Sequence, residues 1–395
     1  MAEESTQPTS AEVHKEDEGK VNESGSAPKQ KSARVAVVAQ SPPADGDTTD
    51  EEENEEEESE VDDSEILSDL PDDMDEINLI HSRLKSVSNL GLTRFKALKK
   101  LCLRQNFIST LDPEVFNELT ELEELDFYDN NLKGIGHALD KCTKLGVLDL
   151  SFNVVRHIPD AFEHLKSLHT IYFVQNKISH ITGLSPLGAT LRSLELGGNR
   201  IRVIEGLGDL VNLEELWLGK NKITKLENLE NLKKLKILSI QSNRITKLEG
   251  LEGLENLEEL YLSHNGIERI EGLEKNLKLR TLDIGANFLK EIENVSHLHE
   301  LEELWINNNK IETIQAVEPQ LKHISTLETV YLEGNPCQAK EGVHYRRKII
   351  LALPQLKQLD ATYVKLMAFP LQFYDSSTFL ILPGSPHTLF TYYPE

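Results

Sequence analysis

The strongest constraint on this chain is a repeat that occupies most of its length. The pattern LxxLxLxxN, followed by one residue and then Leu or Ile, recurs in eleven clear copies between Leu98 and Asn335. Its asparagines stand 22 residues apart over five successive intervals from Asn199 to Asn309, and 23 or 24 apart upstream. A degenerate copy with serine at the asparagine position begins at Ile77. This periodicity predicts a stack of similar units, each buried by its neighbours.

Each position of the repeat has a physical role. The alternating LxL segment predicts a short strand whose leucines point to one side and whose middle residue points to the other. The asparagine can bond the backbone at the turn that follows, so stacked copies should form an asparagine ladder. Apolar residues at three-residue spacing then predict short helical or 3₁₀ turns on the outside. The expected fold is an α/β leucine-rich-repeat solenoid, a right-handed superhelix with a curved parallel sheet on its concave face.

The chain divides by composition into four segments. Residues 1–75 hold 25 acidic and 5 basic residues, a net charge of -20, so the remaining 42 acids and 37 bases give only -5 of the total of -25. We expect this acidic segment to be disordered, because it repels itself and has few large apolar side chains. Repeats follow at 76–336, with an atypical cap at their start. A C-terminal cap at 337–366 should contain a helix from Tyr345 to Leu353, and we assign no fold to 367–395.

Several classes of function are disfavoured. The acidic balance argues against non-specific nucleic-acid binding, which requires Lys and Arg. The three cysteines form no metal or disulfide pattern, which suggests an intracellular protein with reduced thiols. No apolar stretch reaches the roughly 20 residues of a membrane helix. Nucleotide, hydrolase and metalloprotease motifs are absent from the sequence, and we read His297 and His299 as surface residues. We therefore predict a soluble, monomeric, non-enzymatic protein without cofactors or metals.

The middle residues of the LxL segments should face the concave surface, which solenoids use for binding. Both tryptophans of the protein, Trp217 and Trp305, are in this column, among acids and tyrosines. Exposed aromatics surrounded by acids are typical of an interface, although rings could also stack to support the sheet. The acids favour a partner with a basic patch. The column reads Cys102, Asp126, Asp149, Tyr172, Glu195, Trp217, Ser239, Tyr261, Asp283, Trp305 and Tyr331.

The segments LGKNKITKL, LYLSHNGIE and LDIGAN, together with the cap NP…YRRK…LALP…LDATYV, resemble the leucine-rich regulatory subunits of protein phosphatase 1, the regulatory subunit 7 type. The resemblance covers about residues 72–365. It implies a regulator that binds the phosphatase 1 catalytic subunit on its concave face, resides in the nucleus and cytoplasm, and can join a further inhibitor subunit. The residues implied in partner binding are Asp149, Tyr172, Glu195, Trp217, Asp283, Glu303, Trp305 and Tyr331.

The sequence departs from that family in two places. The repeats between Asn106 and Asn199 are one or two residues longer than the family's 22, and the extension at 367–395 lies outside its pattern. A second hypothesis is an acidic chaperone for basic proteins such as histones, motivated by the acidic segment; an RNA-associated adaptor is disfavoured by the charge. Ser59 and Ser64 lie among acids and are candidate phosphorylation sites.

Overall fold

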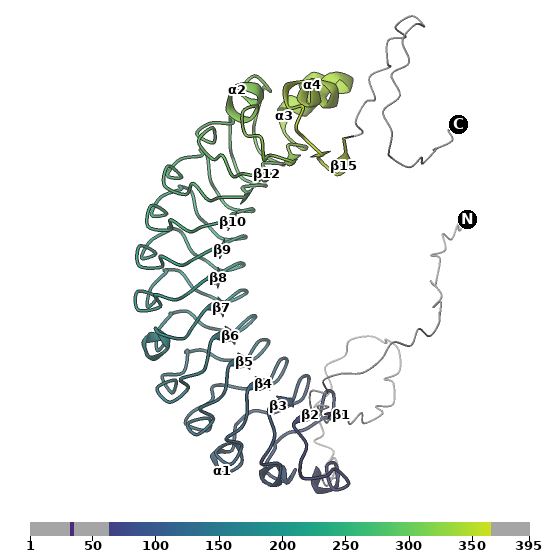
Figure 1. Cartoon of the computed structure of the whole chain (residues 1–395), viewed down its shortest axis with the longest axis vertical. Coiled ribbons are helices and arrows are strands. Elements are labelled where there is room, and N and C mark those ends of the chain that lie inside the picture. Colours follow the sequence, from purple (N-terminus) through teal and green to yellow (C-terminus); the bar gives the residue numbers. More distant parts are fainter. Residues whose placement is uncertain (1–31, 35–62, 365–395) are drawn as a thin grey trace, which may run out of the picture.

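The computed structural model describes residues 32–34 and 63–364, which wind into a curved solenoid (Figure 1). One sheet of fifteen strands runs along its inner side, and the strands follow one another in chain order. Neighbouring strands are parallel, except for the final antiparallel pair. Because each strand is followed by its neighbour one repeat later, the sequence period becomes the spatial period of the sheet. The predicted leucine-rich-repeat fold is confirmed.

Twelve strands of three residues each belong to the repeats. The leucine, isoleucine or valine at the centre of each strand is buried and its two neighbours are mostly half-buried, as alternation requires. The strands are Glu76–Asn78 (β2), Lys100–Cys102 (β3), Glu124–Asp126 (β4), Val147–Asp149 (β5), Thr170–Tyr172 (β6), Ser193–Glu195 (β7), Glu215–Trp217 (β8), Ile237–Ser239 (β9), Glu259–Tyr261 (β10), Thr281–Asp283 (β11), Glu303–Trp305 (β12) and Thr329–Tyr331 (β13).

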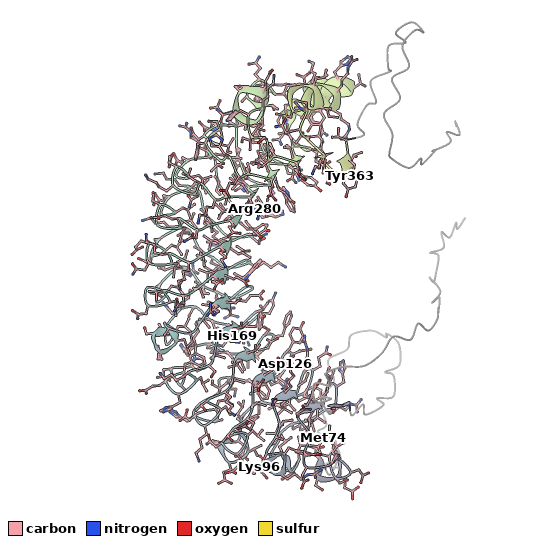
Figure 2. All side chains as sticks on the ribbon, viewed as in Figure 1. Met74, Lys96, Asp126, His169, Arg280 and Tyr363 are labelled. Atoms are coloured by element: carbon pink, nitrogen blue, oxygen red, sulfur yellow. The ribbon has the colours of Figure 1, made fainter. Side chains whose placement is uncertain are left out.

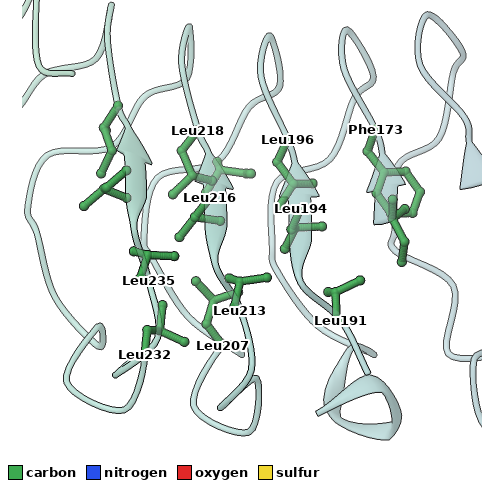
Figure 3. Packing of buried hydrophobic residues seen from close by; sticks show 14 of the residues in the cluster. Phe173, Leu191, Leu194, Leu196, Leu207, Leu213, Leu216, Leu218, Leu232 and Leu235 are labelled. Atoms are coloured by element: carbon green, nitrogen blue, oxygen red, sulfur yellow. The ribbon is translucent and has the colours of Figure 1, made fainter. Parts of the chain in front are cut away.

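The core is a continuous column of aliphatic side chains between the sheet and the outer turns. Figure 3 shows Leu194, Leu196, Leu216 and Leu218 on adjacent coils, with Leu213 from the segment before β8. All five are 0% exposed. Burial of this kind contributes about 25 cal/mol per Å² of apolar surface, and each unit needs its neighbours to complete it.

The predicted asparagine ladder is present inside the coil. The Asn221 side chain accepts from the backbone N–H of Ile201 at 3.0 Å, and its amide donates to the carbonyls of Leu196 and Leu218 at 2.9 and 3.0 Å. The same pattern recurs from Asn106 to Asn335. Ser82, at the degenerate first position, is buried and its hydroxyl has no partner among the described residues.

The outer side consists mainly of turns, with few helices. Short helices occur at Pro113–Phe116 (α1) and Val317–Leu321 (α2), and 3₁₀ turns at Asp63–Glu65 (η1), Leu92–Arg94 (η2) and Ser185–Leu187 (η3). Asp112 caps α1 by accepting from the N–H of Glu114. Short, hydrogen-bonded turns of three residues allow the outer side to match the spacing of the strands.

Both ends of the solenoid are covered. At the C-terminus, Pro336–Glu341 (α3), Gly342–His344 (η4) and Tyr345–Ala352 (α4) precede the pair Gln358–Leu359 (β14) and Thr362–Tyr363 (β15). The expected helix from Tyr345 to Leu353 corresponds to α4, whereas α3 and β15 were not expected. Arg346 fixes this end by donating to the carbonyls of Leu359, Thr362 and Tyr363.

The N-terminal cap starts earlier than the sequence suggested. We expected disorder through residue 75, but the chain is placed from Asp63, with Leu67 and Met74 buried in the core. Their apolar side chains cover the first coil. The average composition of residues 1–75 is so acidic that it does not reveal these few apolar residues. A strand at Ser32–Arg34 (β1) also pairs with β2. The acidic run at 50–60, Ser59 and the extension at 367–395 lie outside the described residues.

Candidate protein-interaction site

The parallel register brings the middle residues of the repeats into one column on the concave face. From β4 to β13, each middle residue lies opposite the middle residue of the next strand. Asp126 is opposite Asp149, Asp149 is opposite Tyr172, Tyr172 is opposite Glu195, and the column continues to Tyr331. Figure 2 shows Asp126 at the inner side of the solenoid. Since neighbouring strands lie about 4.8 Å apart, side chains far apart in the sequence become direct neighbours. We call this set the concave column.

The structure divides the eight residues implied by the resemblance into two groups. Asp149, Tyr172, Glu195 and Trp217 follow one another on β5 to β8, and Asp283, Glu303, Trp305 and Tyr331 lie on β11 to β13. The strands β9 and β10 separate these groups and carry Ser239 and Tyr261 in the same column. The site therefore spans nine adjacent strands.

Tyr261 connects the two groups, although the set drawn from the resemblance omitted it. Its ring stacks with that of Trp217 at a centroid separation of 6.3 Å and an interplanar angle of 19°. The intervening Ser239 is small and buried, which leaves room for the rings to meet above it. The Tyr261 hydroxyl donates to Glu259 Oε2 at 2.7 Å. The sequence signal was present, since Tyr261 belongs to the same LxL column.

A second aromatic pair lies toward the C-terminal cap. Trp305 and Tyr331 make an edge-to-face contact with centroids 5.3 Å apart. The indole Nε1 of Trp305 donates to Glu303 Oε2 at 3.0 Å, and the hydroxyl of Tyr331 accepts from Gln358 Nε2 at 2.6 Å. These bonds hold both rings in defined orientations. An oriented ring loses less conformational entropy when a partner binds.

The acids of the N-terminal half are electrostatically coupled. The pKa of Asp126 is raised by burial and further by the neighbouring charge of Asp149, against backbone and Arg104 hydrogen bonds that lower it. Burial and the charge of Asp149 also raise the pKa of Glu195. A column of mutually repelling carboxylates is more stable when a cation neutralises it, so this half favours a basic partner surface.

Asp283 differs from the other residues of the site. It is 4% exposed, and its Oδ1 accepts from the backbone N–H of Gly285 at 2.9 Å. Burial raises the pKa of this carboxyl, while hydrogen bonds from Gly285, Ser263 and Gln241 oppose the rise. Its column neighbours are Tyr261 and Trp305. Asp283 thus supports the turn beneath the aromatic residues and offers little surface for direct contact.

A second column on this face was not expected from the sequence: Arg104 and Tyr128 stand two residues after Cys102 and Asp126, and Phe152 joins them three residues after Asp149. There, the guanidinium of Arg104 lies 4.1 Å from the ring centroid of Tyr128, and the rings of Tyr128 and Phe152 are 4.7 Å apart. Arg104 also forms a salt bridge with Asp126 at 3.1 Å. Strand alternation predicts that Arg104 and Tyr128 share the face of the middle LxL residues. Phe152 stands one position later, where the backbone φ is 54°, so alternation does not predict its place on this face.

A groove runs between the two columns. It has a volume of about 520 Å³ and is lined by Glu195, Trp217 and Phe152 over a floor that includes Gly197 and Gly219. The absence of side chains at these glycines opens the sheet backbone to an approaching group. The groove is therefore shaped to receive a protruding side chain beside an acid and an indole.

Other site types find no support in residues 63–364. No group of three or more His, Cys, Asp or Glu side chains is placed to hold a metal ion there. His297 Nε2 instead lies 3.0 Å from the carbonyl of Leu273, and His299 packs against His323. Within the same residues, no helix has the length and apolar character to cross a membrane.

Comparisons with known proteins agree with this architecture. A family model described as "Leucine rich repeat" matches residues 72–132 and 96–155, and one described as "Leucine Rich repeats (2 copies)" matches 189–231, 233–275 and 277–323. A crystal structure of an internalin from Listeria monocytogenes superimposes with a TM-score of 0.62 at 24% identity, covering 74% of this chain and 82% of that one. This likeness concerns the fold alone.

Two curated relatives are more specific. "Protein phosphatase 1 regulatory subunit SDS22" of Saccharomyces cerevisiae is 49% identical over 96 residues, 24% of this chain and 28% of that protein. "Protein phosphatase 1 regulatory inhibitor subunit PPP1R7 homolog" of Arabidopsis thaliana is 37% identical over 158 residues, 39% of this chain and 47% of that protein. The chain thus matches less than half the length of each. Names of regulatory subunits and a repeat scaffold both indicate a binding protein, not an enzyme.

Proposed function

This chain belongs to the leucine-rich-repeat proteins, and from that premise we propose that it is a non-catalytic regulatory subunit of protein phosphatase 1. It binds the catalytic subunit through the concave column and thereby controls its activity or location. The observation that carries this proposal is the concave column from Asp149 to Tyr331, which combines two contacting pairs of aromatic rings with neighbouring acids. The matches to proteins named as phosphatase 1 regulatory subunits support this choice of partner.

The physical role of the two halves differs. The acids of β5 and β7 attract a basic patch and fix its register, since charge complementarity mainly governs encounter and orientation. The rings of Trp217, Tyr261, Trp305 and Tyr331 provide the apolar area at which binding energy concentrates. Because hydrogen bonds and ring contacts hold these side chains in place, little reorganisation precedes association.

The first experiment is a pull-down and titration of the phosphatase 1 catalytic subunit with wild type and a Trp217→Ala/Trp305→Ala variant. Circular dichroism should first establish that both are folded. The matched control is Phe107→Ala/Phe288→Ala, which removes two rings that are 55% and 50% exposed and lie outside the concave column. We expect wild type and control to bind alike, and the tryptophan variant to lose at least about tenfold, or about 1.4 kcal/mol.

Failure of the folded wild type to bind would overturn the proposal and bring forward the chaperone hypothesis. Histone binding that disappears on deletion of residues 1–62 would support that alternative. The deletion must stop before residue 63, because Leu67 and Met74 belong to the core. Residence in the nucleus and cytoplasm and joining of a further inhibitor subunit remain predictions, tested by imaging and by co-purification.

A further inference from the structure

A row of basic residues lies beside the concave face, on a surface that the proposed function does not use. Lys177, Arg200, Lys222 and Arg244 each directly follow the ladder asparagine of four successive repeats. The backbone N–H of each donates to a carbonyl of the preceding coil at 2.8 Å, for example Arg200 to Ile178 and Lys222 to Ile201. This backbone ladder fixes the four bases in one line along the solenoid.

Two further bases, Arg156 and Arg202, follow ladder asparagines by three residues and widen the row. We call the six residues the basic ridge: Arg156, Lys177, Arg200, Arg202, Lys222 and Arg244. Four of them are exposed, and Lys177 and Lys222 are half-buried.

The charges of the basic ridge are not neutralised within the described part of the chain. None of its six side chains forms an ion pair or hydrogen bond to residues 63–364. Lysines three residues after Lys222 and Arg244 on the same coils behave differently, since Lys225 lies near Glu227 and Glu249 and Lys247 lies near Glu249. Available glutamates are thus taken by the neighbouring lysines, and the ridge is left with its full positive charge.

The ridge has defined ends. From Lys177 to Arg244, no acid occupies the three positions after any ladder asparagine, whereas Glu268 and Glu312 occupy them further on. At the N-terminal end, a pocket of about 280 Å³ is lined by Lys133, Arg156, His157 and Lys177 with Val154, and by no acid.

We propose that the basic ridge binds a short acidic segment of a partner protein, lying extended along the solenoid. Coils spaced by about 4.8 Å place four successive bases over roughly 14 Å, the length of four to five extended residues. Like charges on adjacent coils repel one another in the free protein, and an acidic peptide removes that repulsion. The guanidinium groups of the arginines in the ridge can form paired hydrogen bonds with either carboxylate or phosphate groups.

A nucleic acid fits this surface less well. The ridge covers only a short length, and glutamates such as Glu205, Glu227 and Glu249 follow it within a few residues on the same coils. A long polyphosphate would pass beyond the bases onto these acids, and its many charges could not all find counterions on the protein. A peptide of limited length avoids that repulsion.

The test uses the full chain and three fluorescein-labelled probes: an eight-residue polyglutamate peptide, an eight-residue peptide with alternating phosphoserines, and a single-stranded oligothymidylate of equal charge. Binding is followed by fluorescence anisotropy at two salt concentrations. The ridge variant is Arg200→Glu/Lys222→Glu/Arg244→Glu. The control variant, Lys166→Glu/Lys233→Glu/Lys275→Glu, makes the same change in net charge at exposed positions outside the ridge.

We expect a peptide probe to bind wild type and the control within twofold of each other, and to lose at least tenfold in affinity on the folded ridge variant. Equal binding of the two peptides identifies a carboxylate-rich partner, and tighter phosphopeptide binding identifies a phosphorylated one. Absence of peptide binding, or equal loss in the control, would overturn the proposal. Preferential binding of the oligothymidylate would overturn the choice of partner class. Neither result depends on whether phosphatase 1 binds.

Discussion

Trp217 and Tyr261 stack across the concave face with their ring planes inclined by 19°, although the strand that carries Ser239 lies between them. A tyrosine outside the set implied by family resemblance thereby joins two groups of residues into one surface. Ser239 makes this possible, since a larger side chain at its place would separate the rings. The contact between the two rings is set by the register of the three parallel strands.

We expect Tyr261→Ala to weaken binding of the phosphatase 1 catalytic subunit by about three- to tenfold, because an aromatic pair contributes about 0.5–1.5 kcal/mol beyond its buried area. Tyr261→Phe keeps the ring but removes the hydrogen bond to Glu259, so it should weaken binding less. Titration calorimetry on both variants checks this. If Ala and wild type bind equally well, the stacked pair is a support for the sheet and takes no part in the interface.

Loss of one asparagine from the ladder should lower the stability of the folded protein. Asn221→Ala leaves the backbone N–H of Ile201 and the carbonyls of Leu196 and Leu218 without their side-chain partner. Each buried group left unpaired costs about 1–3 kcal/mol, so urea unfolding should shift to clearly lower concentration. Asn231→Ala, which removes only an exposed 3.3 Å bond to Gly208, is the control and should unfold close to wild type.

The opposite change should stabilise the first repeat. Ser82 occupies the ladder position but its buried hydroxyl has no partner in residues 63–364. Ser82→Asn supplies an amide that can reach the carbonyls of its own coil, as Asn106 does with Leu103 and Arg104. We expect a gain of about 0.5–1.5 kcal/mol. Hydrogen exchange near β2 measures it; faster exchange in the variant would mean that the larger side chain does not fit.

Binding to a basic surface should depend on pH through the concave acids. The pKa values of Asp126 and Glu195 are raised by burial and by Asp149. A carboxyl whose pKa is raised in the folded state becomes protonated at a higher pH than an ordinary carboxyl, whose pKa is about 4. Affinity should therefore weaken in mildly acidic solution, while the same protonation favours the folded state.

Glu195→Gln removes one of these titrating groups, so its affinity should be lower at neutral pH and vary less as the pH falls. Glu312→Gln is the matched control, since Glu312 lies beside Lys340 away from the concave column and its pKa is lowered by that lysine. Calorimetry from neutral to mildly acidic pH compares the three proteins. Identical pH profiles for wild type and Glu195→Gln would exclude a contribution from this acid.

The cysteines should be slow to react. Burial raises the pKa of the Cys102 thiol to about 11 and that of Cys142 to about 12. Because the thiolate is the nucleophile, alkylation of the native protein at pH 8 should run on the order of a hundredfold slower than in urea. Mass spectrometry of iodoacetamide-treated protein gives the rate at each site. Rapid modification of native Cys102, which lies half-buried on the concave face, would show that its thiol pKa is not raised.

Much of this architecture follows from sequence because the solenoid depends on local periodicity. Strand alternation predicts which leucines are buried, and the regular spacing of the asparagines predicts the hydrogen-bonded ladder. The same alternation predicts that Trp217 and Trp305 share one face. In a repeat protein the contacts between coils are set by the period, so a residue's position within its repeat largely determines its environment.

Contacts between side chains of coils with different sequences were decided by the tertiary structure. The stacking of Trp217 with Tyr261 required a small residue on the strand between them, and the burial of Asp283 required the turn at Gly285. The cap that begins at Asp63 forms because Leu67 and Met74 pack against the first coil. The acidic composition around these two residues gives no sign of that contact. The basic ridge likewise arises because the available glutamates pair with other lysines. Sequence alone fixed which residues share a row; only packing decided which neighbours each side chain meets, because burial, stacking and ion pairing depend on atoms from adjacent coils.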